Sequence, residues 1–329
     1  MVNQFLPHVD PNHPVLRQDY AVSTPPVEEM ARTLGDWIDQ RQPGGYIYGP
    51  SRFGKSRGVR WLLQRNLEER FQGSLPLHIW VRPPGVQVTE SAFWRGWLRA
   101  VNHRYAGKRR SADELRDVFK QFLLTGGASS FTNLIILLVD EAQDMSIREW
   151  GWLLGIQNEL DYEGYRLSVF SVASHQMGYQ YELMARADYA HIAARFMVAH
   201  WKFPGLCSEE EVAFVLHGYD TASEWPTSTG VSYLAHFAPA EFARGERLHD
   251  CARTIWRVLN ALLPDQYRGE VTFPMQHLAR AVEEVLRRLG RGDDWDETTS
   301  ESVWLQLFAE THFSDHMRLI AASASPRRA

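Results

Sequence analysis

The apolar positions of this chain follow two patterns, and the change from one to the other comes near residue 204. Up to that point, short runs that are mostly apolar alternate with stretches of helical spacing. Each run predicts a buried strand. The runs cover 46–48, 77–81, 134–139, 167–172 and, more weakly, 198–203. Strands that alternate with helices are typical of a parallel, doubly wound sheet, so the first 200 residues predict an α/β fold.

Helices are predicted between these runs. Thr24 followed by Pro25 is a helix start, and apolar residues then recur at helical spacing as far as Ile38. Further helices are expected over 59–67, 89–105 and 112–124. The last of these begins with a capping box formed by Ser111 and Glu114.

The pattern is helical throughout from Pro204-Gly205 to about residue 322, and Ser208 and Glu211 form a second capping-box pattern at its start. The predicted organisation is an N-terminal arm over 1–20, an α/β domain over 21–204, an all-helical region over 205–322 and a flexible tail over 323–329.

Composition supports a folded protein and narrows its class. The chain is 44% hydrophobic and 23% charged, which allows a large core. Cys207 and Cys251 are too few for a disulfide-stapled fold or a four-cysteine zinc site, and they indicate a reducing compartment. No apolar run approaches the roughly 20 residues that span a bilayer, and the N-terminus lacks the features of a signal peptide. We therefore expect a cytoplasmic protein with no membrane partner.

One motif carries specific chemistry. It is the phosphate-binding pattern G-x-x-x-x-G-K-[ST], written here as Gly49-Pro50-Ser51-Arg52-Phe53-Gly54-Lys55-Ser56. It follows a predicted strand and precedes a predicted helix, where backbone N–H groups and a helix N-terminus can wrap a phosphate. Lys55 is expected to reach the terminal phosphates of ATP, and Ser56 to ligate Mg²⁺.

Acidic residues follow the longest apolar run. Asp140 is placed to hold Mg²⁺ and Glu141 to act as general base toward the attacking water. An apolar strand that ends in acidic residues is common by itself. The upstream P-loop is what favours the catalytic interpretation here.

Three further residues are candidates for catalysis. Ser174, at the end of the fourth predicted strand, could orient the attacking water, although ordinary strand-end polarity explains it equally well. Arg195, before the fifth strand, could act as an arginine finger in a neighbouring subunit, and Arg186 is an alternative finger. A surface ion pair is the competing interpretation of both arginines. The pair His312 and His316 lacks a recognised metal motif, so no metal site is predicted there.

Charge is unevenly distributed. Residues 41–120 hold 16 basic and 6 acidic residues, a net charge of +10, in a chain whose total is −5. Such a segment favours a polyanionic partner, either phosphate or nucleic acid, although solvated helix faces would give the same count.

Taken together, these motifs resemble those of AAA+ ATPases, and within them the TnsC/TniB-type transposition regulators, relatives of the phage Mu B protein. The resemblance covers roughly residues 15–265. It rests on Ser23-Thr24-Pro25 before the P-loop, Gly49–Ser56, Asp140-Glu141-Ala142-Gln143 and Arg195-Phe196.

The resemblance implies an ATPase that binds ATP at subunit interfaces and assembles as a ring or helical filament on double-stranded DNA. Such proteins connect a target-selection protein to a transposase, and hydrolysis drives their disassembly. It also implies a helical lid after the AAA+ domain, whereas the helical region beyond residue 265 has no counterpart in the resemblance and is expected to be a C-terminal extension that docks a partner. DNA would be gripped by Lys108, Arg109 and Arg110, and a second sensor arginine is not evident, with Arg247 and Arg253 as candidates.

Two other functions remain open from the sequence. One is a signalling NTPase that oligomerises without DNA, although such proteins usually carry longer effector regions. The other is a protein-remodelling motor, although Pro83-Pro84-Gly85-Val86 does not supply an aromatic–hydrophobic–Gly pore loop. Stimulation of ATP hydrolysis by DNA would separate the transposition regulator from both.

Overall fold

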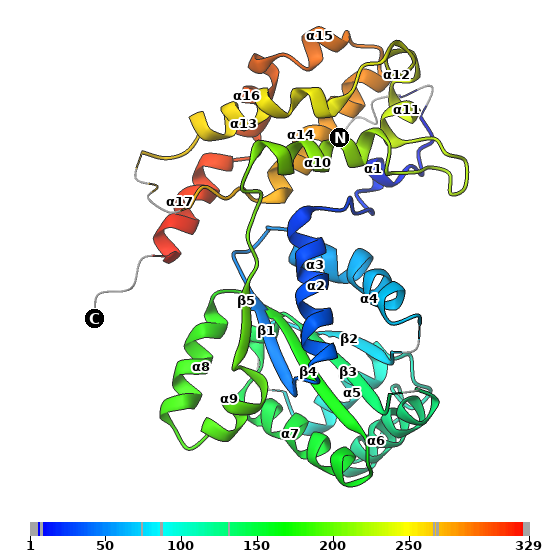
Figure 1. Cartoon of the computed structure of the whole chain (residues 1–329), viewed down its shortest axis with the longest axis vertical. Coiled ribbons are helices and arrows are strands. Elements are labelled where there is room, and N and C mark those ends of the chain that lie inside the picture. Colours follow the sequence, from blue (N-terminus) through cyan, green and yellow to red (C-terminus); the bar gives the residue numbers. More distant parts are fainter. Residues whose placement is uncertain are drawn as a thin grey trace. The chain divides into compact units, whose positions relative to one another are not determined.

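A computed structural model describes residues 6, 9–73, 75–85, 88–130, 132–265, 267 and 270–324. The chain forms two compact units, coloured along the sequence in Figure 1. The sheet unit holds Glu28–Ser51 and Lys55–Phe203. The helical unit holds the described residues up to Val27, the short segment Arg52–Gly54 and the described residues from Pro204 onwards.

The sheet unit is built on five parallel strands in the order β2-β3-β4-β1-β5. They are β1 (Gly44–Tyr48), β2 (Leu77–Val81), β3 (Leu134–Asp140), β4 (Arg166–Ala173) and β5 (Ala199–Lys202). All five predicted strands are present, each within two residues of its predicted ends. Every residue of β3 is buried, as its uninterrupted apolar run predicts. The parallel α/β fold is confirmed.

Helices cover both faces of this sheet (Figure 1). They are α2 (Pro25–Asp39), α3 (Lys55–Gly58), the π-helical turn η1 (Val59–Leu63), α4 (Gln64–Arg70), α5 (Glu90–Ala100), α6 (Ala112–Ser129), the 3₁₀ turn η2 (Ala142–Asp144), α7 (Ile147–Tyr162), α8 (Gln176–Arg186) and α9 (Ala190–Phe196). Ile135, Leu137 and Val169 share one buried cluster with residues of α5, α6, α7 and α9. On α2, the ring of Trp37 stacks on Phe170 of β4.

Each predicted helix of the sheet unit is present, with differences in extent. The helix predicted over 89–105 ends at Ala100, and the helix predicted over 59–67 is part of a longer run in which α3, η1 and α4 follow one another directly. The capping box of Ser111 and Glu114 is formed as predicted. Helices α7, α8 and α9 were not predicted. The first residues of α7 nevertheless form a capping box, in which the Ser146 side chain accepts from the Glu149 N–H and the Glu149 side chain accepts from Ser146.

The helical unit holds α1 (Pro14–Arg17), α10 (Glu209–Asp220), α11 (Tyr233–Phe237), α12 (Pro239–Arg244), the 3₁₀ turn η3 (Leu248–Cys251), α13 (Ala252–Ala261), α14 (Met275–Gly290), α15 (Trp295–Thr298), α16 (Glu301–Glu310) and α17 (Phe313–Ala324). Its core is one cluster of buried side chains that includes Leu216, Ile255, Val282 and Trp304. These come from four different helices, each burying one apolar stripe.

The N-terminal segment packs within the helical unit. His13 accepts a hydrogen bond from Val15 N and so caps the four-residue α1. The Tyr20 hydroxyl lies 2.8 Å from that of Tyr219 and donates to Glu283 at 3.0 Å. A four-residue helix is too short to give a periodic apolar pattern, which explains why the sequence predicted only an arm here.

The second predicted capping box forms only in part. Ser208 Oγ accepts from Glu211 N at 3.2 Å, but the Glu211 carboxylate accepts from Cys207 N at 2.6 Å.

The C-terminal helix α17 continues to Ala324, past the predicted start of the tail, and residues 325–329 of that tail lie outside the described residues. Among the described helices, none is long and apolar enough to cross a membrane.

Candidate nucleotide site

The P-loop connects β1 to α3 at the carboxyl end of the parallel sheet. Gly49 N donates to Ala173 O at 3.2 Å, which extends the β1–β4 pairing into the loop. A Cβ at Gly49 would lie 2.8 Å from the carbonyl oxygen of Phe203, so this position has no room for a side chain. Gly54 has a φ of +107°, a conformation that glycine adopts without steric cost. Both motif glycines are therefore required by the backbone.

Lys55 is held at the start of α3 with 8% of its surface exposed. Its Nζ donates to Gly49 O at 2.8 Å and to Pro50 O at 2.6 Å, so the ammonium lies inside the curve of the loop. Burial lowers the pKa of Lys55 to about 8, while the nearby Asp140 and Glu141 raise it. A partly desolvated cation in this position is suited to a multiply charged phosphate.

Ser56 and Asp140 meet, as the motif predicts for a shared metal ion. The Ser56 hydroxyl hydrogen-bonds the Asp140 carboxyl group. Asp140 ends β3, is 3% exposed and accepts from Glu141 N at 2.9 Å. Burial raises the pKa of Asp140, and the bonds from Ser56 and Glu141 N oppose that rise. A hydroxyl and a buried carboxylate are ligands that Mg²⁺ accepts, so these residues fit the ion.

Glu141 and Ser174 are joined by a residue for which the sequence predicted no role. The Gln143 side chain donates from Nε2 to Glu141 Oε2 at 2.6 Å and accepts at Oε1 from Ser174 N at 2.8 Å. Glu141 has a left-handed backbone with φ +59°, which turns the chain sharply after β3. Gln143 thus fixes the end of β3 against the end of β4.

The Ser174 hydroxyl is engaged locally, because its Oγ accepts from Gln176 N at 3.3 Å at the start of α8. The neighbouring His175 lies near enough to Lys55 of the P-loop for that charge to affect its pKa. Its pKa is lowered by burial first and then by the positive charges of Lys55 and Lys202. His175 was among the polar residues at this strand end in the sequence, but nothing there favoured it over Ser174.

Arg195 and Arg186 lie outside this carboxyl-end cluster. Arg195 is at the end of α9, directly before β5, and its guanidinium reaches Asn158 Oδ1 at 3.4 Å. Arg186 ends α8 with 83% of its side chain exposed and lies 3.9 Å from Glu182. Since β5 pairs Ala199 with Gly45 and Lys202 with Tyr48, Arg195 is at the amino end of the strands, opposite the P-loop.

The basic loop between α5 and α6 forms a compact cationic cluster. Lys108 and Arg109 are exposed, and Arg110 is half-buried. The charged groups of Arg104, Lys108 and Arg110 lie 4.8, 5.2 and 4.5 Å from the centre of the Tyr105 ring. Cations over an aromatic face are attracted to its π electrons, which holds this cluster in place. Neither Arg104 nor the organising role of Tyr105 was predicted from the sequence.

The two candidate sensor arginines form hydrogen bonds and an ion pair within the helical unit. Arg247 donates to Phe242 O at 2.9 Å and to Glu246 O at 2.7 Å, and Arg253 pairs with Glu209 at 3.5 Å. A different arginine, Arg280, is joined through Gln276 to Arg52, a P-loop residue that belongs to the helical unit. With its amide oriented to satisfy both neighbours, Gln276 accepts from Arg52 at 3.1 Å and from Arg280 at 3.2 Å. No spacing in the sequence marks Arg280, since only the fold brings α14 beside Arg52.

Comparison with known proteins agrees with this geometry. A family model described as an AAA domain matches residues 38–176. The chain is similar to the Aeropyrum pernix ORC2 protein solved with ADPNP and ADP, with 12% identity, a TM-score of 0.59, and coverage of 92% of this chain and 72% of that one. The ADP form of the same protein gives 13% identity, a TM-score of 0.56, and coverage of 86% and 67%. Among curated proteins, none matches significantly.

These similarities concern the fold, because the identities are low. Together with the five parallel strands, the P-loop at their carboxyl end and the helices that follow, they lead to one conclusion. Residues 38–176 match the AAA domain model, and the chain has the AAA+ fold, an α/β P-loop NTPase fold with a helical C-terminal part.

Proposed function

We propose that this protein is an Mg²⁺-dependent ATPase of the TnsC/TniB type, which assembles on double-stranded DNA and links a target-selection protein to a transposase in the cytoplasm. The observation that carries the ATPase activity is the cluster of Lys55, Ser56, Asp140 and Glu141 at one edge of the sheet. The buried cation, the hydroxyl–carboxylate pair and the adjacent second carboxylate are the groups that phosphoryl transfer requires. The complexes of the structurally similar ORC2 protein with ADPNP and ADP support nucleotide as the ligand.

In this mechanism the P-loop amides and Lys55 hold the β- and γ-phosphates. Ser56 and Asp140 would hold Mg²⁺, which neutralises phosphate charge when bound. Glu141 accepts a proton from the attacking water, and Gln143 keeps the carboxylate oriented through its 2.6 Å hydrogen bond. Arg195 acts on the site of a neighbouring subunit, since its position at the opposite end of β5 separates it from its own P-loop.

DNA binding is supported by the cluster around Tyr105. Lys108 and Arg109 are exposed, Arg104 is exposed beside them, and the ring holds the cations together. A preorganised group of cations neutralises backbone phosphates and releases counterions, without reading sequence. The role in transposition rests on the motif resemblance, from Ser23-Thr24-Pro25 to Arg195-Phe196, and not on the fold.

The test is ATP hydrolysis with Mg²⁺, measured with and without duplex DNA, together with DNA affinity as a function of salt. The Lys108→Ala/Arg109→Ala/Arg110→Ala variant should lose DNA stimulation and show a slope of log affinity against log salt that is shallower by about 2–3. The matched control removes three exposed arginines elsewhere, Arg166→Ala/Arg257→Ala/Arg318→Ala, and should keep the wild-type slope.

Electron microscopy with a non-hydrolysable ATP analogue then separates the remaining functions. Assemblies that form only on DNA support the proposal. Assembly without DNA, combined with hydrolysis that DNA does not stimulate, would favour a signalling NTPase. Hydrolysis stimulated by unfolded protein instead of DNA would favour a remodelling motor.

A further inference from the structure

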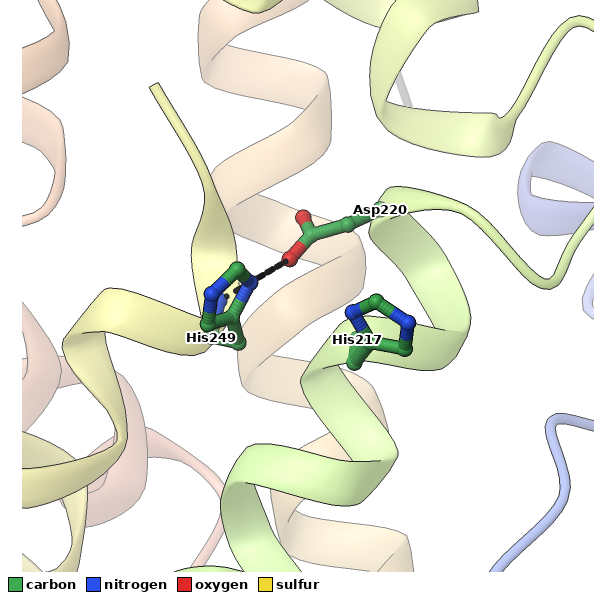
Figure 2. Close-up of side chains that lie close together, drawn as sticks. All are labelled: His217, Asp220 and His249. Carbon is green, nitrogen blue, oxygen red and sulfur yellow. Dashed lines mark hydrogen bonds and ion pairs between the residues drawn. The ribbon is translucent and has the colours of Figure 1, made fainter. Parts of the chain in front are cut away.

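A cluster of three metal-ligating side chains lies in the helical unit. His217 and Asp220 come from α10, and His249 comes from η3, 29 residues after Asp220 (Figure 2). One possible ligand atom from each lies within 4.8 Å of the other two. Among the described residues this is the only such group of three or more.

The local structure explains why these side chains converge. His217 and Asp220 are three residues apart on α10 and therefore lie on the same face of the helix. Asp220 is fully buried, and its Oδ1 accepts from Leu248 N at 2.9 Å while Oδ2 accepts from His249 N at 3.0 Å. These two bonds hold η3 against the end of α10 and carry the His249 ring toward the carboxylate.

The ring of His249 lies close to both Asp220 and His217. Its Nδ1 lies 2.8 Å from Asp220 Oδ2, and its centroid lies 5.6 Å from that of His217. Figure 2 shows the His217 ring one turn before Asp220 on α10, on the side where His249 approaches. His217 is exposed, and its Nε2 contacts the hydroxyl of Thr221 on the same helix at 2.9 Å.

We propose that His217, Asp220 and His249 bind a divalent transition-metal ion of the zinc class. Two imidazoles and one carboxylate are a typical ligand set for such ions, whereas Mg²⁺ and Ca²⁺ prefer oxygen ligands alone. Solvent water completes the coordination, because the exposed His217 leaves one side of the cluster open.

The required movements are small. Ligands of a tetrahedral zinc ion lie about 3.3 Å apart, given bonds of about 2.0–2.1 Å. The 2.8 Å separation of His249 Nδ1 and Asp220 Oδ2 must widen slightly, and the His217 nitrogen must approach by no more than about 1.5 Å. With metal on Nδ1, the neutral His249 ring carries its proton on Nε2, which already lies 3.7 Å from Asp250 Oδ1. A carboxylate beside the far ring nitrogen is the usual support of a metal-bound histidine.

A structural interpretation accounts for part of the cluster, since Asp220 alone fixes η3. It does not account for His217, which makes no hydrogen bond to η3 among the contacts that the described residues show. His217→Ala therefore separates the two interpretations, because it removes a ligand and leaves the bonds from Asp220 to η3 intact.

The experiment measures Zn²⁺ binding by the full-length, tag-free protein in competition with a chromogenic chelator. The expected result is about one ion per chain, retained in excess Mg²⁺. His217→Ala and His249→Ala should each weaken affinity at least about tenfold. Two control variants replace exposed residues outside the cluster, namely a histidine on α9 (His191→Ala) and a cysteine (Cys207→Ser). Both should bind Zn²⁺ with the wild-type affinity.

Thermal unfolding provides the second measurement. Because Zn²⁺ would bind only the folded cluster, it should raise the Tm of the wild type and of His191→Ala but not that of His217→Ala. Without Zn²⁺, His217→Ala should unfold at the wild-type temperature, which shows that it is folded. Absence of stoichiometric Zn²⁺ binding, or unchanged affinity in His217→Ala, would overturn the proposal.

Discussion

The guanidinium of Arg82 and the carboxylate of Glu149 form an ion pair from which solvent is excluded, with 2% and 0% of the two side chains exposed. Arg82 Nε lies 2.7 Å from Glu149 Oε1, and a second nitrogen lies 3.3 Å from Oε2. Oε2 also accepts from Ser146 N at 2.8 Å, and Arg82 N donates to Asp140 O at 2.9 Å. The pair thus fixes the start of α7 beside the strand end that carries Asp140.

Removal of Arg82 should strongly reduce the stability of the protein. We expect Arg82→Ala to lower the free energy of unfolding by about 3–5 kcal/mol, because the Glu149 charge would stay buried without its main partner. Urea denaturation measures this, with Arg148→Ala as the matched control. Arg148 is exposed on the same turn, so its loss should change stability by about 0.5 kcal/mol or less. A loss of under about 1 kcal/mol in Arg82→Ala would show that the pair is not a main support of this edge.

A second prediction concerns pH. The pKa of Lys55 is about 8 because burial disfavours its charged form. Nucleotide phosphates would stabilise the ammonium and raise that pKa, so ATP binding above pH 8 takes up a proton. ATP affinity should therefore be constant below about pH 8 and fall as pH rises above it, by at most about tenfold per pH unit.

Calorimetry across this pH range, in two buffers of different ionisation enthalpy, measures both affinity and proton uptake. Lys55→Arg keeps its charge throughout, so its affinity should be weaker but independent of pH over the same range. A wild-type affinity that does not change between about pH 7 and 9.5 would contradict the lowered pKa.

The strands could be predicted from the sequence because four of the five are short, mostly apolar runs, and β5 gave only a weaker signal, since its residues Ala199–Lys202 include His200 and Lys202. Leu134–Val139 predicts a strand buried on both faces, and all of β3 is buried. The order of the strands was not accessible, since an apolar run does not specify its neighbours. Helix α7 could have been found, because Ser146 and Glu149 repeat the pattern recognised at Ser111 and Glu114.

The residues of the candidate sites also fall into those that could be predicted from the sequence and those that could not. Lys55, Ser56, Asp140 and Glu141 follow from motifs in which local sequence determines geometry, and the structure brings them together. Residues that join these groups only through tertiary contacts were not predicted from the sequence. Gln143 is recognisable only once β3 and β4 are known to be adjacent, and His249 only once η3 is known to pack on Asp220.

The third prediction separates catalysis from positioning. Glu141→Gln removes the proposed base and should lower kcat by about 10²–10⁴-fold while ATP affinity stays unchanged. Gln143→Ala should lower kcat by about tenfold, because Glu141 and Ser174 lose their link but the base remains. Gln143→Glu would place a second carboxylate against Glu141 and should be more harmful than Gln143→Ala.

Steady-state kinetics with measured ATP affinity provide the test, and Gln176→Ala, at an exposed position beside Ser174, is the control. If Gln143→Ala weakens ATP binding as strongly as it slows turnover, its role is to shape the pocket and not to position the base.

The last prediction concerns Arg195. The four residues of β5, at about 3.3 Å per residue, place it more than about 10 Å from the carboxyl edge of its own sheet. We therefore expect any contribution of Arg195 to hydrolysis at another subunit's site. Arg195→Ala should lower kcat by about 10³-fold or more and leave ATP affinity unchanged, since a finger stabilises charge in the transition state. Mixing Arg195→Ala with Lys55→Ala should restore part of the activity, because an interface can then pair an intact P-loop with an intact finger.

Arg186→Ala, which removes the more exposed alternative, should retain activity on its own. Full activity in Arg195→Ala together with loss in Arg186→Ala would move the finger to the end of α8, and an absence of rescue at every mixing ratio would show that Arg195 does not act across subunits.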